Sequence, residues 1–276
     1  MLFAATHPAE PGRAKSFPHA RWLTWSPSFR AALARHRDAA RRLRPALRAL
    51  VPTQEYSRTF SISLAALGTR AINDLSPFAA SLASWSPQSD VYFFTDLSCV
   101  AEGWSVRQLF ATLRALIVRV TGNKWTALYT PLATLGATAG DFPLHCDLYV
   151  PEILFNVFDR VPKDESGSTI LLPRSEFLRI LAATKSVPQS VAARIRTLLT
   201  EPTTQDSYDE FFDLVHGSEH PWSQPLATSL AKKQRTIHLG RHEGYLLHDR
   251  QWLHGRTQPS GVVRRDRVHR LIYRAG

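Results

Sequence analysis

Three residues in the second half of the chain have the side chains and spacing of a metal site. His145 and Asp147 lie two positions apart, and His254 follows much further along the chain. On a strand, residues two apart place their side chains on the same face, so His145 and Asp147 could reach one ion. Two imidazoles and one carboxylate can occupy one face of an octahedral Fe(II) ion and leave positions open for a bidentate cosubstrate and O2. The triad therefore favours oxygen chemistry at a metal.

The distal histidine has one competitor. His248 also ends a β-type run, so it stays open as an alternative to His254. We prefer His254 because Gly255 follows it directly and lets the backbone turn tightly. The predicted metal ligands are therefore His145, Asp147 and His254.

An arginine-rich segment, residues 266–274, follows the second histidine and has the pattern of a strand. A cation at this place could hold the distal carboxylate of a keto acid, because a guanidinium binds a carboxylate through two parallel hydrogen bonds. The segment therefore adds a cosubstrate site to the predicted metal site.

Length and composition predict one large folded domain. The chain has 276 residues, is 44% hydrophobic and contains seven tryptophans, enough to fill a substantial core. No run approaches the roughly 18 apolar residues that cross a bilayer, so we expect no membrane partner. The first residues lack the charged and apolar pattern of a secretory signal. Only two cysteines are present, which is typical of a cytoplasmic protein without disulfides.

The net charge of +11 is concentrated in two short segments. Residues 30–48 hold seven arginines and one aspartate, and residues 264–274 hold five arginines and one aspartate. The rest of the chain is nearly neutral, whereas a nucleic-acid footprint would be broader and interleaved with aromatic residues. We therefore expect no nucleic-acid partner and interpret the first cluster as the solvated face of a helix. An anionic partner that docks there is the alternative.

The periodicity of apolar residues divides the chain into helical and β-type parts. Helices are predicted after Ser26-Pro27 and between Ser105 and Gly122, and strands over residues 56–64 and 91–95. Beyond residue 125 the apolar runs become short, with turns between them, as in strands. These runs are WTALYTPLATLG, EILFNVFDRV, STILL, RTIHLG and EGYLLH.

Helical patterns within residues 174–216 interrupt these β-type runs. A fold that is mainly β, with flanking helices and a helical insertion, fits a double-stranded β-helix, or jelly roll. We expect a single catalytic domain over residues 1–276. Its parts are an N-terminal arm and basic helix (1–55), a jelly-roll core with supporting helices (56–173 and 230–276) and the insertion (174–229).

The motifs together resemble a known family. His145-x-Asp147, Gly167-Ser168-Thr169, His254-Gly255-Arg256 and the arginine-rich terminal strand occur in the order found in Fe(II)/2-oxoglutarate-dependent dioxygenases. More narrowly, the chain is similar to the taurine dioxygenase and clavaminate synthase-like superfamily over residues 125–276. The resemblance implies Fe(II), 2-oxoglutarate and O2 as cofactors, with the triad as the iron ligands.

The resemblance also implies roles for further residues. Thr169 matches the residue that hydrogen-bonds the distal carboxylate of 2-oxoglutarate, and an arginine of the last strand would pair with the same carboxylate. Arg267 fits the family's spacing from the distal histidine, whereas Arg270 fits the local strand pattern. Alternation places these two on opposite faces, so at most one points inward. We favour Arg270 and leave Arg267 open. We expect Arg274 and Asn156 to meet the substrate, with core packing as the alternative for Asn156.

The expected reaction is hydroxylation of an unactivated C–H bond in a small molecule, such as an amino acid or a natural-product intermediate. The spare arginines would suit a substrate with an anionic group. Halogenation is disfavoured because related halogenases lack the carboxylate ligand, whereas Asp147 is present. Desaturation and cyclisation use the same triad and stay open, and the sequence indicates no oligomeric state.

Two other classes of protein fit the same residues. One is a β-rich protein whose histidines and aspartate bind zinc structurally or bind nothing, with the basic helix as a docking module. The other is a cupin-like isomerase or hydrolase, which uses the same fold and a metal but needs neither Thr169 nor the terminal arginine. Keto acid turnover would separate both from an oxygenase.

Overall fold

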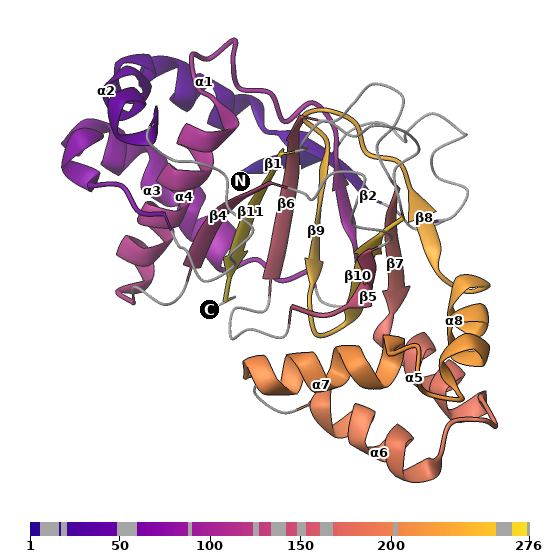
Figure 1. The fold of residues 1–276 in the computed structure, drawn as a ribbon. Helices are drawn as coiled ribbons and strands as arrows, with labels where there is room; N and C mark the ends of the chain where they lie inside the picture. The colour runs from indigo at the N-terminus through magenta and orange to yellow at the C-terminus, as the bar shows by residue number, and fades with distance from the viewer. Residues whose placement is uncertain are drawn as a thin grey trace.

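A computed structural model gives the arrangement of most of the chain. It describes residues 1–5, 17, 21–48, 60–87, 90–123, 127–133, 142–147, 153–160, 168–200, 204–257 and 267–274. The described strands form two sheets, one of seven strands and one of four. Helices lie to either side of them (Figure 1).

Both sheets are antiparallel except at one pair, where β2 runs parallel to β3. In spatial order the seven-stranded sheet contains β1 (Phe3–Ala5), β2 (Arg21–Trp25), β3 (Tyr92–Phe94), β9 (Gly244–His248), β6 (Ile153–Arg160), β11 (Arg267–Tyr273) and β4 (Ala127–Ala133). The four-stranded sheet contains β5 (Phe142–His145), β10 (Trp252–Arg256), β7 (Thr169–Pro173) and β8 (Arg235–Ile237). Strands far apart in sequence therefore pair, as closure of a two-sheet core requires.

The two sheets pack against each other through one apolar cluster. Leu154 and Leu247 of the larger sheet and Leu171 and Trp252 of the smaller sheet belong to it, and all are buried. Side chains alternate along each strand, so every second residue of these strands faces the space between the sheets. The metal-site candidates lie on this same inner face, as described below.

Helices cover the outer faces. Helices α1 (Pro27–Arg35), α2 (Arg37–Arg48), α3 (Thr69–Ala83) and α4 (Val106–Thr121) pack on the larger sheet through a second cluster that includes Phe110, Phe155 and Leu271. Helices α5 (Arg174–Ala183), α6 (Gln189–Leu198), α7 (Gln205–His216) and α8 (Ser223–Ala231) share a third cluster with Ile170 and Leu253 of the smaller sheet. Figure 1 shows the two helical groups at opposite sides of the sheets.

Local signals explain where the predicted helices begin and end. The Ser105 side chain accepts from the Gln108 amide while Gln108 accepts from the Ser105 amide, so a capping box starts α4. Gly122 ends α4 with a φ of 70°, a conformation that glycine adopts without strain. The basic segment after Ser26 forms two helices that break at His36, where the prediction had one.

Two expectations need correction, and two helices were not expected. A strand was predicted over residues 56–64, but residues 60–63 form none, and a 3-10 turn follows at Leu64–Ala66. Residues 56–59 lie outside the described part of the chain. Helices α3 and α8 had not been predicted. Helices hold more of the described residues than strands do, so "mainly β" applies to the core and not to the whole chain.

No helix in the described part of the chain is long and apolar enough to cross a membrane.

A buried polar chain lies on the outer face of the larger sheet, away from the space between the sheets. Tyr129 of β4 hydrogen-bonds to Nδ1 of His269 on β11 at 2.7 Å, and Nε2 of His269 lies 3.3 Å from the carboxylate of Asp159 on β6. The bond to His269 is the main cause that lowers the pKa of Asp159 from 3.8 to about 2, against a smaller opposing effect of burial. Three strands are thereby joined by polar contacts as well as by the sheet.

We expect Asp159→Asn to destabilise the protein at pH 7, because it removes the carboxylate that contacts His269. The loss should be roughly 1–2 kcal/mol, since the carboxylate is partly exposed and solvent screens part of its pKa shift. A carboxyl whose pKa is depressed on folding stabilises above its unfolded pKa and loses this effect as the pH falls through the folded pKa. The difference between wild type and variant should therefore shrink between about pH 4 and pH 2. Urea unfolding across this range measures it, and a difference that does not change with pH would contradict the assignment.

Candidate metal centre

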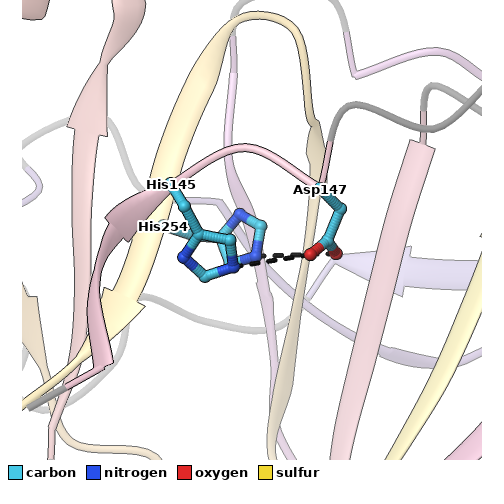
Figure 2. A group of neighbouring side chains, drawn as sticks. All are labelled: His145, Asp147 and His254. Carbon is cyan, nitrogen blue, oxygen red and sulfur yellow. Dashed lines mark ion pairs between the residues drawn. The ribbon is translucent and has the colours of Figure 1, made fainter. Parts of the chain in front are cut away.

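His145, Asp147 and His254 meet in the space between the two sheets. His145 ends β5 and lies directly opposite His254 of the neighbouring β10, and Asp147 follows two residues after His145. The imidazole centroids are 4.3 Å apart, and one ligand atom from each of the three residues lies within 4.8 Å of the others. Figure 2 shows both rings turned toward the Asp147 carboxylate. Residues from distant parts of the sequence thus form one compact donor set.

Strand alternation explains why His145 and His254 share a face, and Asp147 follows two residues beyond the end of β5. Leu144, Cys146 and Leu253, their neighbours in sequence, point the other way into the cluster beneath the insertion helices. Cys146 is fully buried, its thiol contacts the Trp252 carbonyl at 3.6 Å, and burial holds its pKa far above the usual value. Cys146 therefore packs and does not join the donor set.

A hydrogen bond to the backbone determines which nitrogen of His145 faces the site. Nδ1 of His145 lies 2.9 Å from the Pro143 carbonyl, which can only accept, so Nδ1 carries the proton. Nε2 of His145 lies 3.4 Å from one oxygen of Asp147, and Nε2 of His254 lies 3.7 Å from the other. The two Nε2 atoms therefore converge on a single carboxylate (Figure 2).

This donor set fits a divalent transition metal. His145, Asp147 and His254 are 0%, 7% and 2% exposed, and within the described residues Nε2 of His254 has no hydrogen-bond partner. A buried imidazole nitrogen left without a partner is costly, and a metal ion would satisfy it. Two histidines and one carboxylate grouped on one side match the facial arrangement of non-haem Fe(II), although zinc can use the same donors.

The electrostatics keep the donors in the states that bind a metal. Burial by itself would raise the pKa of Asp147, but the Arg270 guanidinium and the two imidazoles outweigh this and hold the pKa far below its usual range. Burial, and then the nearby His145, lower the pKa of His254, which favours its neutral imidazole. An ionised carboxylate and a neutral imidazole are the metal-binding forms.

The larger sheet contributes a cation to the same place. Arg270 of β11 faces inward, where Nη1 donates to Asp147 at 2.5 Å and Nε donates to the Asn156 amide oxygen at 3.1 Å. The Asn156 amide nitrogen in turn donates to the Tyr245 hydroxyl at 2.7 Å. Asn156 and Arg270 are directly opposite each other on β6 and β11. The favoured arginine and one predicted substrate residue thus lie in one buried network beside the triad.

The other predicted site residues are placed less closely. Thr169 of β7 is 4% exposed and points to the same inner side as Leu171, and it pairs with Arg256, two residues from His254. Arg274 is exposed just beyond the end of β11. The Arg267 side chain and Gly167 lie outside the part of the chain that the structure describes.

His248, the competing distal histidine, takes another position. It ends β9 in the larger sheet opposite Ile153, and its Nδ1 accepts a hydrogen bond from the Arg250 amide at 3.2 Å. Among the described residues, the group with His145 and Asp147 that could hold a metal ion contains His254 and not His248.

Three neighbours of the triad were missed from the sequence. Tyr245 lies two residues before Leu247 in a β-type run, so strand alternation could have placed it on the inner face. Tyr208 of α7 meets the His145 ring edge-on with centroids 6.2 Å apart, and Asp249 lies 3.3 Å from His254. No sequence pattern indicated Tyr208 or Asp249. The packing of α7 brings Tyr208 to the triad, and the turn between β9 and β10 brings Asp249 there.

Comparison with known proteins finds distant structural likeness only. No family model matches the chain, and no curated protein matches it. Among solved structures, the PvcB protein from Pseudomonas aeruginosa is 11% identical, with a TM-score of 0.40, over 92% of this chain and 85% of its own. The non-haem iron oxygenase OrfP is 11% identical with a TM-score of 0.36, covering 92% and 94% of the two chains. Asparagine oxygenase, solved with Fe(II), 3-hydroxyasparagine and succinate, is 11% identical with a TM-score of 0.42, covering 92% and 93%.

We expect His145→Ala, Asp147→Ala and His254→Ala each to weaken binding of Co(II) or Fe(II) by at least about 100-fold, because each removes one of only three protein ligands. His248→Ala is the matched control and should bind the metal like wild type. Anaerobic titration followed by the visible bands of Co(II) measures the affinities. Loss of binding in the His248 variant, with binding kept in the His254 variant, would reverse the assignment.

Proposed function

We propose that the protein is an Fe(II)- and 2-oxoglutarate-dependent oxygenase that hydroxylates an unactivated C–H bond of a small molecule, such as an amino acid or a natural-product intermediate. The observation that carries the proposal is the buried convergence of two imidazole Nε2 atoms and one carboxylate beside an inward-facing arginine. The two facing sheets, with ligands from strands of one and the arginine from the other, suit a double-stranded β-helix.

His145, Asp147 and His254 would hold the iron. When bound, Fe(II) with 2-oxoglutarate supplies the oxidising chemistry, in which the keto acid loses CO2 to give succinate as O2 is consumed. The task of the chain is to hold the reactants and to exclude water. All three ligands are nearly inaccessible to solvent, so the site is suited to reactive chemistry that water would quench.

Arg270 would bind the distal carboxylate of 2-oxoglutarate. Its guanidinium is positioned by the Asn156 amide oxygen and lies within reach of the iron ligands, since it contacts Asp147. A planar guanidinium can hold a carboxylate through two hydrogen bonds, and a threonine hydroxyl, here Thr169, can add a third. Arg267 stays the second candidate for this role.

The substrate would bind on the side of the site that the iron ligands and the 2-oxoglutarate residues leave open. Asn156 is held between Arg270 and Tyr245, and so it would present a fixed polar group beside the metal-binding triad. Arg274, exposed at the end of β11, is suited to meet an anionic group of the substrate as it arrives from solvent. As an iron ligand, Asp147 would occupy the position that a halide needs in related halogenases, which favours hydroxylation over halogenation.

The decisive test is anaerobic titration of Fe(II) and 2-oxoglutarate into the apo-protein. We expect the weak visible charge-transfer band of a chelated keto acid in wild type, and no band in His145→Ala or Asp147→Ala. Exposure to O2 should then yield succinate even without the prime substrate. Metal binding with neither band nor succinate would exclude an oxygenase and favour a non-redox metalloprotein of the cupin type.

Arg270→Lys should weaken 2-oxoglutarate binding by about 10- to 100-fold, because a charge-assisted pair of hydrogen bonds contributes about 1.5–3 kcal/mol. Lysine keeps the positive charge beside Asp147, so metal affinity should change much less. Arg44→Ala, at an exposed arginine of α2, is the control for loss of a surface cation. Band intensity against 2-oxoglutarate concentration gives the dissociation constants, and an unchanged constant in Arg270→Lys would remove Arg270 from this role.

A further inference from the structure

Asp249 occupies an unusual place for a turn residue. Residues 249–251 connect β9 of the larger sheet to β10 of the smaller sheet, so the chain turns a corner between the two layers there. Asp249 is only 3% exposed, although acidic residues in turns usually face solvent. A buried carboxylate is costly unless an interaction compensates its charge.

The carboxylate of Asp249 faces the distal histidine. Oδ1 of Asp249 lies 3.3 Å from Nδ1 of His254, while Nε2 at the other end of the ring lies 3.7 Å from Asp147. This distance is that of an ion pair and is long for a hydrogen bond, and the two groups are not aligned as a hydrogen bond requires. The His254 ring is thus held between two carboxylates, one on the metal side and one behind it.

Hydrogen bonds from both sides fix the corner that carries Asp249. The Gln251 amide donates to the His248 carbonyl at 2.9 Å, and the Arg250 amide donates to Nδ1 of His248 at 3.2 Å. Arg174, the first residue of α5, donates its amide to the Gln251 carbonyl at 2.8 Å and its guanidinium to the Arg250 carbonyl at 3.2 Å. The position of the carboxylate is therefore set by the backbone and by the start of the insertion.

We infer that Asp249 is a positioning residue that orients His254 for the metal. A carboxylate behind the ring keeps the proton on Nδ1, presents the lone pair of Nε2 to the site and makes that nitrogen a stronger donor. The inference rests on the metal site of the proposed function but not on the cosubstrate. It assigns to Asp249 no contact with the metal or with the substrate.

The two histidines are supported in different ways. Nδ1 of His145 faces the backbone carbonyl of Pro143, whereas Nδ1 of His254 faces the side-chain carboxyl group of Asp249. Removal of the Asp249 carboxylate should therefore affect His254 and leave the orientation of His145 unchanged. This difference gives the inference a signature that general destabilisation lacks.

The chain contains a matched control for the experiment. Asp159 also lies 3.3 Å from a histidine nitrogen, Nε2 of His269, but this pair is on the outer face of the larger sheet. We expect Asp249→Asn to weaken Co(II) binding about tenfold and Asp249→Ala up to about 100-fold, as is typical when the outer partner of a metal-bound histidine is removed. Asp159→Asn should bind Co(II) within about twofold of wild type.

The tautomer of His254 provides a second readout that a purely structural role would not change. In the metal-free, ¹⁵N-labelled full chain, long-range ¹H–¹⁵N spectra show which ring nitrogen carries the proton. His254→Ala identifies the signals. Wild type should carry the proton on Nδ1, and Asp249→Ala should shift the population toward Nε2, while His145 keeps its Nδ1 proton in both.

The inference is overturned if Asp249→Ala binds Co(II) like wild type, if Asp159→Asn is weakened equally, or if wild type binds no metal. An unchanged His254 tautomer would also overturn it. Asp249→Asn nearly keeps the side-chain volume, so it decides the matter alone if the alanine variant does not fold. A wild type that binds metal but never turns over 2-oxoglutarate would refute the proposed function and leave the role of Asp249 intact.

Discussion

One buried negative charge links the two halves of this structure. The Asp147 carboxylate faces the Nε2 atoms of His145 and His254 on the smaller sheet, and Arg270 reaches it from the larger sheet. A carboxylate in such a place is unfavourable unless opposite charge and hydrogen bonds compensate it. The same contacts hold it ionised, and so the groups that stabilise the charge also keep it ready to bind a metal.

Strand alternation lets each strand serve two purposes at once. In β11, Leu271 and Tyr273 pack beneath the N-terminal helices while Arg270 faces the site. In β5, Leu144 packs beneath the insertion while His145 faces inward. Because odd and even positions point to opposite faces, the apolar core fixes the register, and the register fixes the position of the polar residues.

The insertion supports the site as well as covering the smaller sheet. His216 at the end of α7 contacts the Leu144 carbonyl at 2.8 Å, next to His145, and Tyr208 of the same helix packs edge-on against the His145 ring. Arg174 at the start of α5 holds the corner that carries Asp249. Both metal-site histidines are therefore braced by helices inserted between β7 and β8.

The sequence by itself determined the residue types of the site and much of its local structure. The spacing of His145-x-Asp147, the cap at Ser105 and the alternation that puts Arg267 and Arg270 on opposite faces depend on short-range geometry, which a sequence pattern can carry. Only the tertiary structure placed His254, and not His248, beside His145 and Asp147, since both end β-type runs but lie in different sheets. The tertiary structure also placed Tyr208 beside His145 and Asp249 beside His254. Those contacts depend on how helices and sheets pack, which local periodicity does not encode.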